Sequence, residues 1–409
     1  MNVLFLCHRF PYPAEGGGKI RALHIVRHLV AQGHRVTLCS PVRSEAEARG
    51  VEHMRALGVD VVTRKLDDRL KTLDMLLAAP TPRPSSFAYF HSRDLAADVE
   101  ALLRSRRFDL VFAHCSSMGP YVAAAAGVPK IMDFADMDSQ KWLDYARHKR
   151  FPANLVYALE GRKLERAEKA LARCFDICTT ISQAELDTFE SYATGTPAEW
   201  FPNGVDLDYF SPGPSYDPDL VAFVGRMDYF PNEQAMRWFC GEVWPKVCAR
   251  RRLRLRIVGA NPSRAVRRLA EIDGVEVTGS VPDVRPYVQP AALTVAPLLI
   301  ARGMQNKVVE SMAMGVPVVA TRRVVRGLGL DVDEPFPLLV ADSAEEYARA
   351  VLELVEHPNR RSELAAASRS LAETSFSWPA ALRRLDEIIA RVVGSDFSGS
   401  ARAAGSARA

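Results

Sequence analysis

Short apolar runs recur along the chain, and between them apolar residues return every three or four positions. The runs are typical of strands buried on both faces, and the wider spacing is typical of amphipathic helices. The runs cover residues 3–7, 36–39, 59–63, 109–113, 130–134 and 176–181, and then 221–227, 254–259, 275–279, 293–297 and 316–320. Strands that alternate with helices in this way predict an α/β protein with doubly wound parallel sheets.

A segment rich in Pro, Gly and Ser separates the two groups of strands. This segment, residues 211–219 (SPGPSYDPD), has the composition of a linker. We therefore expect an N-terminal domain over residues 1–210 and a C-terminal domain over 220–375. A last helix is expected over 376–393, and residues 394–409 are predicted to be disordered because Gly, Ser, Ala and Arg dominate them.

Composition narrows the class of protein. The chain has 409 residues, 48% of them hydrophobic and 25% charged, as in soluble globular proteins. A net charge of +4 argues against a dedicated nucleic-acid-binding protein. The seven cysteines are scattered and do not form a disulfide framework, and no apolar run is long enough to span a membrane. A cytoplasmic protein is expected.

Residues 302–321 (RGMQNKVVESMAMGVPVVAT) predict a loop, a helix, a turn and a strand in succession. The free backbone N–H groups at the start of this helix suit a phosphate, and Lys307 in its first turn adds a positive charge. Glu310 lies one turn further on the same face, where a carboxylate can accept hydrogen bonds from sugar hydroxyls. The segment therefore predicts a nucleoside-diphosphate site, with a surface helix carrying an ordinary Lys–Glu pair as an equal alternative.

A glycine triplet follows the first predicted strand, at residues 16–18, and a predicted helix follows the triplet. Glycines let the backbone approach a ligand closely, and the helix start favours an anion. Pro13 and Ile20 exclude a Walker A motif, and Arg21 excludes the dinucleotide-binding spacing. His114 ends another predicted strand, at the sheet edge where ligands of such folds bind, which favours a functional over a structural histidine.

The register of the 302–321 segment resembles that of glycosyltransferase family 4. That family carries an acidic-G-F-G-x-x-x-x-E loop and helix followed by A-M-A-x-G-x-P-V-V-A, which Gly303, Glu310, residues 311–315 (SMAMG) and residues 316–320 (VPVVA) match. The resemblance implies the GT-B fold, in which two Rossmann-like domains face a central cleft and the last helix crosses back onto the N-terminal domain.

The match departs from the family pattern at two positions. Arg302 stands where the first acid is expected, and Gln305 replaces a glycine. The variant resembles a subgroup from exopolysaccharide clusters linked to PEP-CTERM/exosortase systems, and the resemblance extends over residues 2–393.

The resemblance also implies roles for individual residues. Arg226 is expected to bind the donor phosphate, but Pro231 and Asn232 stand where its usual lysine partner is expected. We expect Lys307 to supply that charge and Glu310 to hold the ribose. His114, Arg226 and Lys307 are the expected catalytic residues. The expected donor-binding residues are Gly17, Gly18, Asn203, Arg226, Val281, Arg302, Gly303, Gln305, Asn306, Lys307 and Glu310.

The acceptor is expected to meet Lys19, Asp136, Asp138 and Trp142. Asp136 and Asp138 have the D-x-D spacing of metal-binding glycosyltransferases, but the same spacing occurs at three other places in the chain, so it carries little information. No metal and no cofactor are expected.

Residues 141–173 carry nine Lys or Arg against four Asp or Glu. Tyr157, Leu164 and Leu171 share one helical stripe within them. A basic amphipathic helix can lie on an anionic membrane, and an ordinary helix packed on the core has the same pattern, so both interpretations stay open.

These features predict a retaining, metal-independent glycosyltransferase that moves a hexose from a nucleoside diphosphate to a saccharide or lipid-linked saccharide acceptor. The expected setting is the cytoplasm, with peripheral contact to the inner membrane face. The alternatives are a catalytically silent donor-binding assembly subunit, motivated by Arg302, and a GT-B sugar-nucleotide epimerase.

Overall fold

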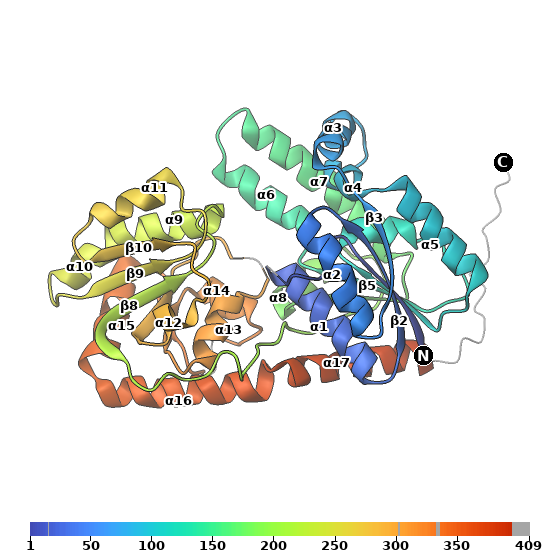
Figure 1. Ribbon diagram of the computed structural model, residues 1–409. Coiled ribbons are helices and arrows are strands. Elements are labelled where there is room, and N and C mark those ends of the chain that lie inside the picture. Colours follow the sequence, from blue (N-terminus) through green and yellow to red (C-terminus); the bar gives the residue numbers. More distant parts are fainter. Residues whose placement is uncertain (15, 302, 333–335, 395–409) are drawn as a thin grey trace.

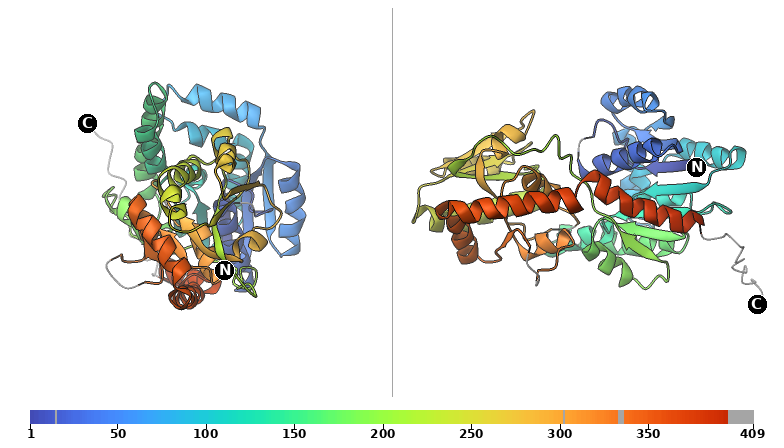
Figure 2. Two further views of the ribbon diagram at one scale, coloured as in Figure 1. Left: turned by 90° about the vertical axis from the view of Figure 1, so that its left-hand side faces the viewer. Right: turned by 90° about the horizontal axis from the view of Figure 1, so that it is seen from below.

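The molecule has two lobes, each built around one parallel sheet (Figure 1). The computed structural model describes residues 1–14, 16–301, 303–332 and 336–394. Long helices at the C-terminal end of the chain run along one side of both lobes (Figures 1 and 2). The expected disordered tail lies outside the described residues, apart from Gly394, which ends the last helix.

The N-terminal sheet has seven parallel strands in the order β3-β2-β1-β4-β5-β6-β7. Its central strands are buried almost throughout, as their continuous apolar sequences predict. The chain reverses its direction of winding between β1 and β4, which lie side by side, so this is the switch point where such sheets bind ligands. The strands are β1 (Asn2–Cys7), β2 (Arg35–Val42), β3 (Asp60–Lys65), β4 (Leu110–His114), β5 (Lys130–Ala135), β6 (Ile177–Thr180) and β7 (Ala198–Trp200).

The C-terminal sheet has six parallel strands in the order β10-β9-β8-β11-β12-β13. Its strands are β8 (Asp217–Val224), β9 (Arg254–Val258), β10 (Val275–Gly279), β11 (Ala291–Ala296), β12 (Val318–Ala320) and β13 (Leu339–Val340). β8 begins at Asp217, so the last three residues of the expected linker belong to a strand. The two-domain, doubly wound architecture predicted from the sequence is confirmed.

Helices cover both faces of each sheet (Figure 1). In the N-terminal domain they are α1 (Gly17–Ala31), α2 (Glu45–Ala56), α3 (Asp68–Ala78), α4 (Ser85–Phe90), α5 (Arg93–Ser105), η1 (Ser116–Tyr121), α6 (Asp138–His148), α7 (Ala153–Ala172) and α8 (Gln183–Glu190). In the C-terminal domain they are α9 (Phe230–Trp238), η2 (Phe239–Val243), α10 (Trp244–Cys248), α11 (Arg264–Arg267), η3 (Arg268–Glu271), α12 (Arg285–Val288), α13 (Asn306–Ala313), α14 (Arg322–Gly327), α15 (Ala344–Glu356) and α16 (Pro358–Ser375).

The last helix, α17 (Trp378–Gly394), crosses back onto the N-terminal domain, as the resemblance implied. Its apolar side chains join the core that β1, β2 and α1 form. Two histidines of α1 contact it: His24 stacks on Trp378 with ring centroids 3.9 Å apart, and His28 Nε2 lies 2.7 Å from Asp386 Oδ1. Both histidines therefore serve the packing of α17.

The chain crosses between the domains at two places that lie side by side. The N–H of Val205 donates to the carbonyl of Phe376 at 2.7 Å, and Val205 pairs with Ser377 as an isolated bridge. A Cβ atom on Gly204 would lie 2.4 Å from the Trp378 Cα, so only glycine fits at this junction. The P-N-G-V-D sequence at residues 202–206 thus forms the contact between the two crossings.

Candidate functional site

Two adjoining cavities lie between the domains, at the carboxyl ends of their central strands. The larger has a volume of about 570 Å³ and includes residues of both domains, and the smaller has a volume of about 430 Å³ and lies mainly in the N-terminal domain. Their linings share Arg9, Gly17, Gly18, Ala135, Asp136, Lys141 and Arg226. Five basic and two acidic side chains line the larger cavity, which gives it the charge that an anionic ligand requires.

Lys307 projects into the larger cavity from the first turn of α13. Its Nζ donates to Asn232 Oδ1 at 2.6 Å and lies 4.5 Å from the centre of the Phe223 ring. Desolvation lowers the pKa of Lys307 to about 7, although the Glu310 carboxylate acts in the opposite direction. Asn232 in turn donates through Nδ2 to the carbonyl of Arg226 at 2.8 Å. Asn232 occupies the position where the family pattern has a lysine, so Lys307 is in direct contact with that position.

Arg226 follows β8 and lines both cavities. Its side chain is 68% exposed and forms an ion pair with Asp228, with Nη2 2.7 Å from Oδ2. Since an exposed ion pair of this kind contributes little stability, an anionic ligand can compete for the guanidinium at small cost.

The glycine triplet of the N-terminal domain lies against the start of α13. Asn203 Nδ2 donates to Asn306 Oδ1 at 3.2 Å, and a Cβ on Gly17 would lie 3.7 Å from Asn306 Nδ2. The starts of two helices, α1 and α13, therefore meet at one cavity, and both present backbone N–H groups suited to an anion.

His114 is fixed by a buried network below the glycine triplet. Its Nδ1 lies 2.7 Å from Asp133 Oδ2, and its Nε2 lies 3.2 Å from the carbonyl oxygen of Gly18. Arg21, 1% exposed, binds both oxygens of Asp133 and also donates to Asn203 Oδ1 at 3.2 Å. Burial alone would raise the pKa of Asp133, but Arg21 and His114 hold it below its ordinary value.

The smaller cavity is lined by two acids and a lysine from the β5–α6 connection and the start of α6. Burial raises the pKa of both Asp136 and Asp138. Burial would lower the pKa of Lys141, but Asp138, Tyr229 and Asp136 together raise it. Asp136 Oδ1 is buried against Gly303 and has no hydrogen-bond partner among the described residues.

The remaining acceptor-side residues also line the smaller cavity. Trp142 lies there beside Asp138, and Lys19 reaches it from α1. Lys19 is already paired, because its Nζ lies 2.6 Å from Glu47 Oε1.

The structure brings only part of the predicted donor site together. Gly17, Gly18, Asn203, Arg226, Asn306 and Lys307 line the larger cavity. Val281, Gly303, Gln305 and Glu310 line neither of the two cavities. Desolvation raises the pKa of the half-buried Glu310 to about 7.

The loop before α13 packs on the N-terminal domain. Gly303 has a φ of +57° and packs against Asp136, since a Cβ there would lie 1.8 Å from Oδ1. Its N–H donates to Glu185 Oε1 at 3.3 Å. Gly303 thus contacts the N-terminal domain, and the donor-binding role expected of it stays a prediction. Arg302 lies outside the described residues.

Sequence reasoning missed the residues that hold the site together. Arg21 and Asp133 interrupt apolar patterns, in a helix and in a buried strand, and such interruptions are a usable signal. Cys115 (φ 72°), directly after β4, and Ala135 (φ 58°), the last residue of β5, have left-handed backbones. Strained backbone of this kind clusters at functional sites but leaves no trace in the sequence.

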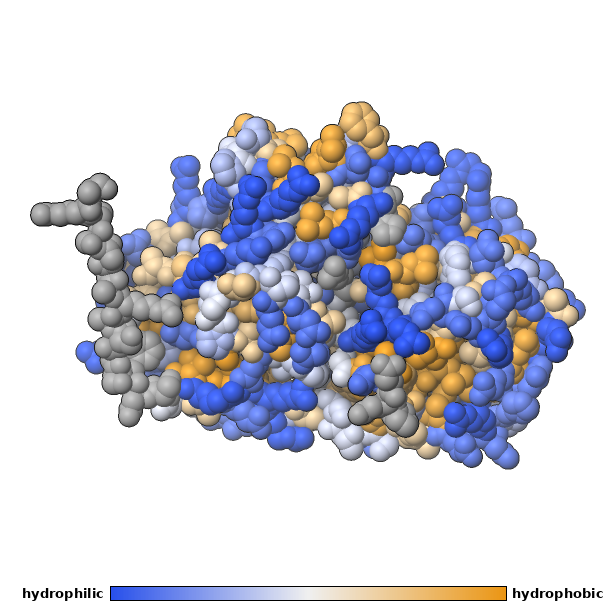
Figure 3. Space-filling model, turned by 180° about the vertical axis from the view of Figure 1, so that it is seen from behind, coloured by the Kyte–Doolittle hydropathy of each residue, from blue (hydrophilic) through white to orange (hydrophobic). Residues whose placement is uncertain are grey.

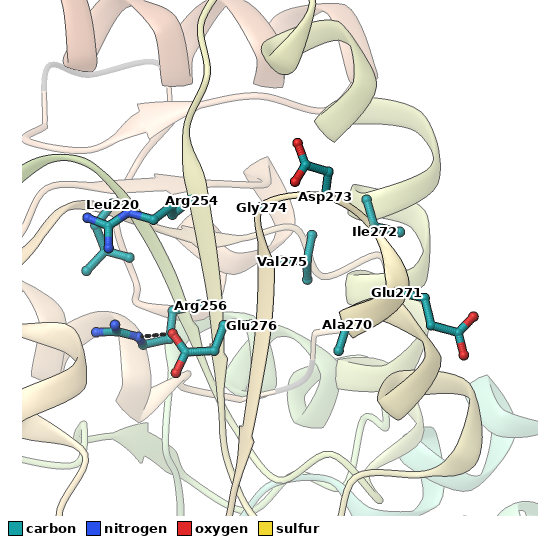
Figure 4. Close-up of a pocket in the computed structure, with 10 residues that line it drawn as sticks. All are labelled: Leu220, Arg254, Arg256, Ala270, Glu271, Ile272, Asp273, Gly274, Val275 and Glu276. Atoms are coloured by element: carbon teal, nitrogen blue, oxygen red, sulfur yellow. Dashed lines mark hydrogen bonds and ion pairs between the residues drawn. The ribbon is translucent and has the colours of Figure 1, made fainter.

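Two other hollows lie at the opposite, amino-terminal ends of strands. One, of about 490 Å³, lies beside β9 and β10, and Figure 4 shows the Arg256–Glu276 ion pair bridging these strands, with Glu271 directed away from it. The other, of about 740 Å³, lies between α5 and the residues that precede β4 and β5. None of the expected site residues lines either hollow.

The basic stretch 141–173 forms α6 and α7. Leu164 and Leu171 of its apolar stripe are buried in the core, and Tyr157 is half-buried beside Trp142. The stripe therefore faces the protein, and the interpretation of this helix face as core packing is confirmed.

The described residues contain no helix that is long and apolar enough to cross a membrane. They also contain no group of three or more His, Cys, Asp or Glu side chains placed to bind a metal ion.

Solved structures with the same architecture define the fold as GT-B. Sucrose-phosphate synthase of Thermosynechococcus elongatus superposes with a TM-score of 0.68 at 16% identity, over 96% of this chain and 99% of that chain. Anabaena Alr3699/HepE, solved with UDP and glucose, superposes with a TM-score of 0.65 at 16% identity, over 95% and 99% of the two chains. At this identity the likeness shows the fold alone.

The sequence matches two glycosyltransferase families in consecutive segments. Residues 16–204 match the family described as "Glycosyl transferase 4-like domain", and residues 218–357 match "Glycosyl transferases group 1". The chain therefore belongs to the GT-B glycosyltransferases that pair these two domains, as the resemblance to family 4 indicated. Its assignment to the PEP-CTERM-linked subgroup stays a prediction.

Two curated relatives come from Corynebacterium. The D-inositol 3-phosphate glycosyltransferase of C. aurimucosum is 31% identical over 214 residues, which are 46% of this chain and 49% of that protein. A GDP-mannose-dependent monoacylated alpha-(1-6)-phosphatidylinositol monomannoside mannosyltransferase of C. glutamicum is 24% identical over 242 residues, 52% of this chain and 62% of that protein. The chain thus matches about half to three-fifths of the length of these relatives.

Proposed function

We propose that this protein transfers a hexose, with retention of configuration and without a metal ion, from a nucleoside diphosphate to a saccharide acceptor. The observation that carries the proposal is the contact between Lys307 and Asn232 at the start of α13, facing the glycine triplet across one cavity. Cleavage of the sugar–phosphate bond leaves extra negative charge on the diphosphate. Lys307, Arg226 and the helix-start N–H groups are placed where they would stabilise that charge.

The sugar would lie where the two cavities adjoin, between the diphosphate and His114. His114 is oriented by Asp133 and lies under the glycine triplet, which suits a positioning contact with the transferred sugar. In a front-face reaction the bond from the sugar to the phosphate oxygen breaks, and the acceptor hydroxyl oxygen bonds to the sugar on the same face. The hydroxyl proton passes to the departing phosphate oxygen, so no nucleophilic carboxylate is needed.

The acceptor would occupy the smaller cavity. The carboxyl groups of Asp136 and Asp138, which line this cavity, would accept hydrogen bonds from sugar hydroxyls, and Trp142 offers a flat apolar surface for a sugar ring. We propose a lipid-linked saccharide as the acceptor. An origin in PEP-CTERM-linked exopolysaccharide synthesis and a cytoplasmic setting at the inner membrane face rest on the resemblance of the 302–321 segment and on the composition.

Calorimetry and a turnover assay test the proposal. The protein should bind UDP or GDP in calorimetry, and should release the sugar slowly from UDP-glucose or GDP-mannose in the presence of EDTA. The anomeric configuration of a transferred sugar, read by NMR, decides between retention and inversion. Binding without any sugar release, with or without Mg²⁺, would instead identify a silent donor-binding subunit. Conversion of the donor without acceptor or hydrolysis would identify an epimerase.

A further inference from the structure

Two neighbouring helices of the N-terminal domain expose large apolar side chains. Each of these side chains is between 51% and 77% exposed, although the core of the domain is well filled. On α3 they are spaced along one face, and on α7 they occupy the first turns and the residues just before them. They are Leu70, Leu73, Leu76 and Leu77 on α3, and Phe151, Leu155, Val156 and Leu159 at the start of α7.

The two groups form one surface, which we call the apolar crest. Lys163 of α7 donates to the carbonyl groups of Ala78 and Ala79 at 3.3 and 2.5 Å, and so joins α7 to the end of α3. The N–H of Ser86, in α4, donates to Glu160 Oε1 at 3.0 Å. Figure 3 shows hydrophobic side chains gathered at the edge of the molecule where Figure 1 places α3 and the α6–α7 turn.

The charges around the crest are predominantly positive. Asp68 and Asp74 are neutralised, because they pair with Arg43 and Lys71 at 2.6 Å. Four exposed arginines near the crest form no ion pair with another described residue. They are Arg69, Arg83, Arg150 and Arg162.

Two of these arginines share a helix face with the apolar side chains. Arg69 precedes Leu73 by four residues on α3, and Arg162 follows Leu159 by three residues on α7, so each lies one turn away on the same helix face. Arg150 is adjacent to Phe151. A surface that combines apolar side chains with unpaired cations matches the boundary between acyl chains and anionic headgroups.

We propose that the apolar crest is a docking surface for an anionic lipid bilayer. The leucines and Phe151 would enter the region below the headgroups, and the arginines would contact the lipid phosphates. A second copy of the chain fits this surface less well, because two apposed crests would bring unpaired arginines together. This inference rests on the described surface alone and not on the proposed reaction.

The position of the crest relative to the cavities is consistent with a lipid-borne ligand. Ser86 and Phe90 of α4 and Trp142 of α6 line the smaller cavity. These helices adjoin α3 and α7, which carry the crest, so a bilayer held there would lie next to the acceptor side of the site.

Vesicle flotation of the full-length protein tests the proposal without any substrate. Binding to vesicles of phosphatidylglycerol and phosphatidylcholine should exceed binding to phosphatidylcholine alone. The triple variant Leu70→Ser, Leu73→Ser, Leu77→Ser should lower the partition coefficient roughly tenfold or more, because each leucine contributes through its buried area. Leu299→Ser, an exposed leucine of the C-terminal domain, is the matched control and should leave binding unchanged.

A second set separates the charges from the apolar contacts. Arg69→Ser, Arg150→Ser, Arg162→Ser should remove the preference for phosphatidylglycerol, whereas Arg252→Ser, 91% exposed on the other domain, should not. Thermal unfolding by circular dichroism confirms that each variant is folded.

Equal vesicle binding of the wild type, the leucine variant and the control would overturn the proposal, as would absence of binding to anionic vesicles. Sedimentation velocity without lipid tests whether a second copy of the chain covers the apolar crest instead. A dimer that dissociates in the leucine variant would assign the crest to a second copy. Because none of these measurements uses a donor, their failure would leave the proposed sugar transfer untouched.

Discussion

The cation of Lys307 is the part of the proposed donor site that a single substitution tests most directly. Lys307→Ala removes an ammonium that is buried at the helix start and held by Asn232 at 2.6 Å. Because the pKa of Lys307 is lowered to about 7, the free protein carries this charge only in part at neutral pH, and completing its protonation costs on the order of 1 kcal/mol or less. The loss of one transition-state donor costs about 2.7–4 kcal/mol, which is much larger.

We therefore expect the turnover rate of Lys307→Ala to fall by a factor on the order of 10² to 10³, and donor affinity to fall less. The reason is that the diphosphate carries its greatest charge in the transition state. Single-turnover release of sugar from UDP-glucose or GDP-mannose measures the first quantity, and calorimetry with UDP or GDP measures the second. Lys246→Ala is the control, because Lys246 pairs with Glu345 on the surface of the same domain.

The contact with Asn232 supplies a rescue experiment. Because Asn232 Oδ1 lies within hydrogen-bond distance of the Lys307 Nζ, a lysine introduced by Asn232→Lys can enter the space that Lys307→Ala vacates. The double variant should recover part of the lost turnover. If Lys307→Ala lowers only the thermal stability and leaves turnover within about twofold of the wild type, an essential charge role for Lys307 is refuted. Arg226 and backbone N–H groups would then have to stabilise the diphosphate alone.

Three further expectations follow from the same contacts. Diphosphate binding should weaken by up to about tenfold per pH unit as the pH rises from 7 to 9, because a bound anion raises the lowered pKa of Lys307 and binding then takes up a proton. UDP calorimetry in buffers of different ionisation enthalpy measures this proton uptake. Absence of the uptake would contradict the role of Lys307 as a diphosphate ligand. Gly204→Ala should lower the free energy of unfolding in urea by about 1–3 kcal/mol because its Cβ collides with Trp378, whereas Gly241→Ala, which meets nothing within 4 Å, should not. Asp133→Asn should lower the free energy of unfolding by about 3–5 kcal/mol in the same assay, because it leaves the buried Arg21 guanidinium unpaired. A decrease below about 1 kcal/mol would show that the Arg21–Asp133 ion pair is dispensable for stability.

Most of the fold could be predicted because its information is local. The central strands of both sheets are continuous apolar runs, and their predicted positions agree with the structure to within a few residues. The edge strands β7 and β13 escaped prediction because they have only three and two residues and are half-buried, so they leave no periodic signal. The early start of β8 was hidden by the Pro and Asp residues that made this segment look like a linker.

The candidate site could be predicted only where topology decides it. A glycine triplet after the first strand and a histidine at the end of β4 had to meet at the switch point, and they do. The contact of Lys307 with Asn232 joins positions 75 residues apart, and its geometry could not be obtained from spacing. Val281 was placed in the donor site by family register and Glu310 by register and helical spacing, and neither tells whether a side chain reaches the cavity.

The side-by-side crossings at Val205 and Phe376 have a mechanical consequence. Both covalent connections between the domains pass through one hydrogen-bonded point, and α17 fixes the second of them to the N-terminal core. Two chain connections at one place act as a hinge, whereas connections at opposite ends of the cleft would restrain its opening. The connectivity therefore allows the two domains to rotate about this point without stretching either connection. Because residues of both lobes line the larger cavity, such a rotation would widen or narrow the cavity and so change the access of a ligand to it.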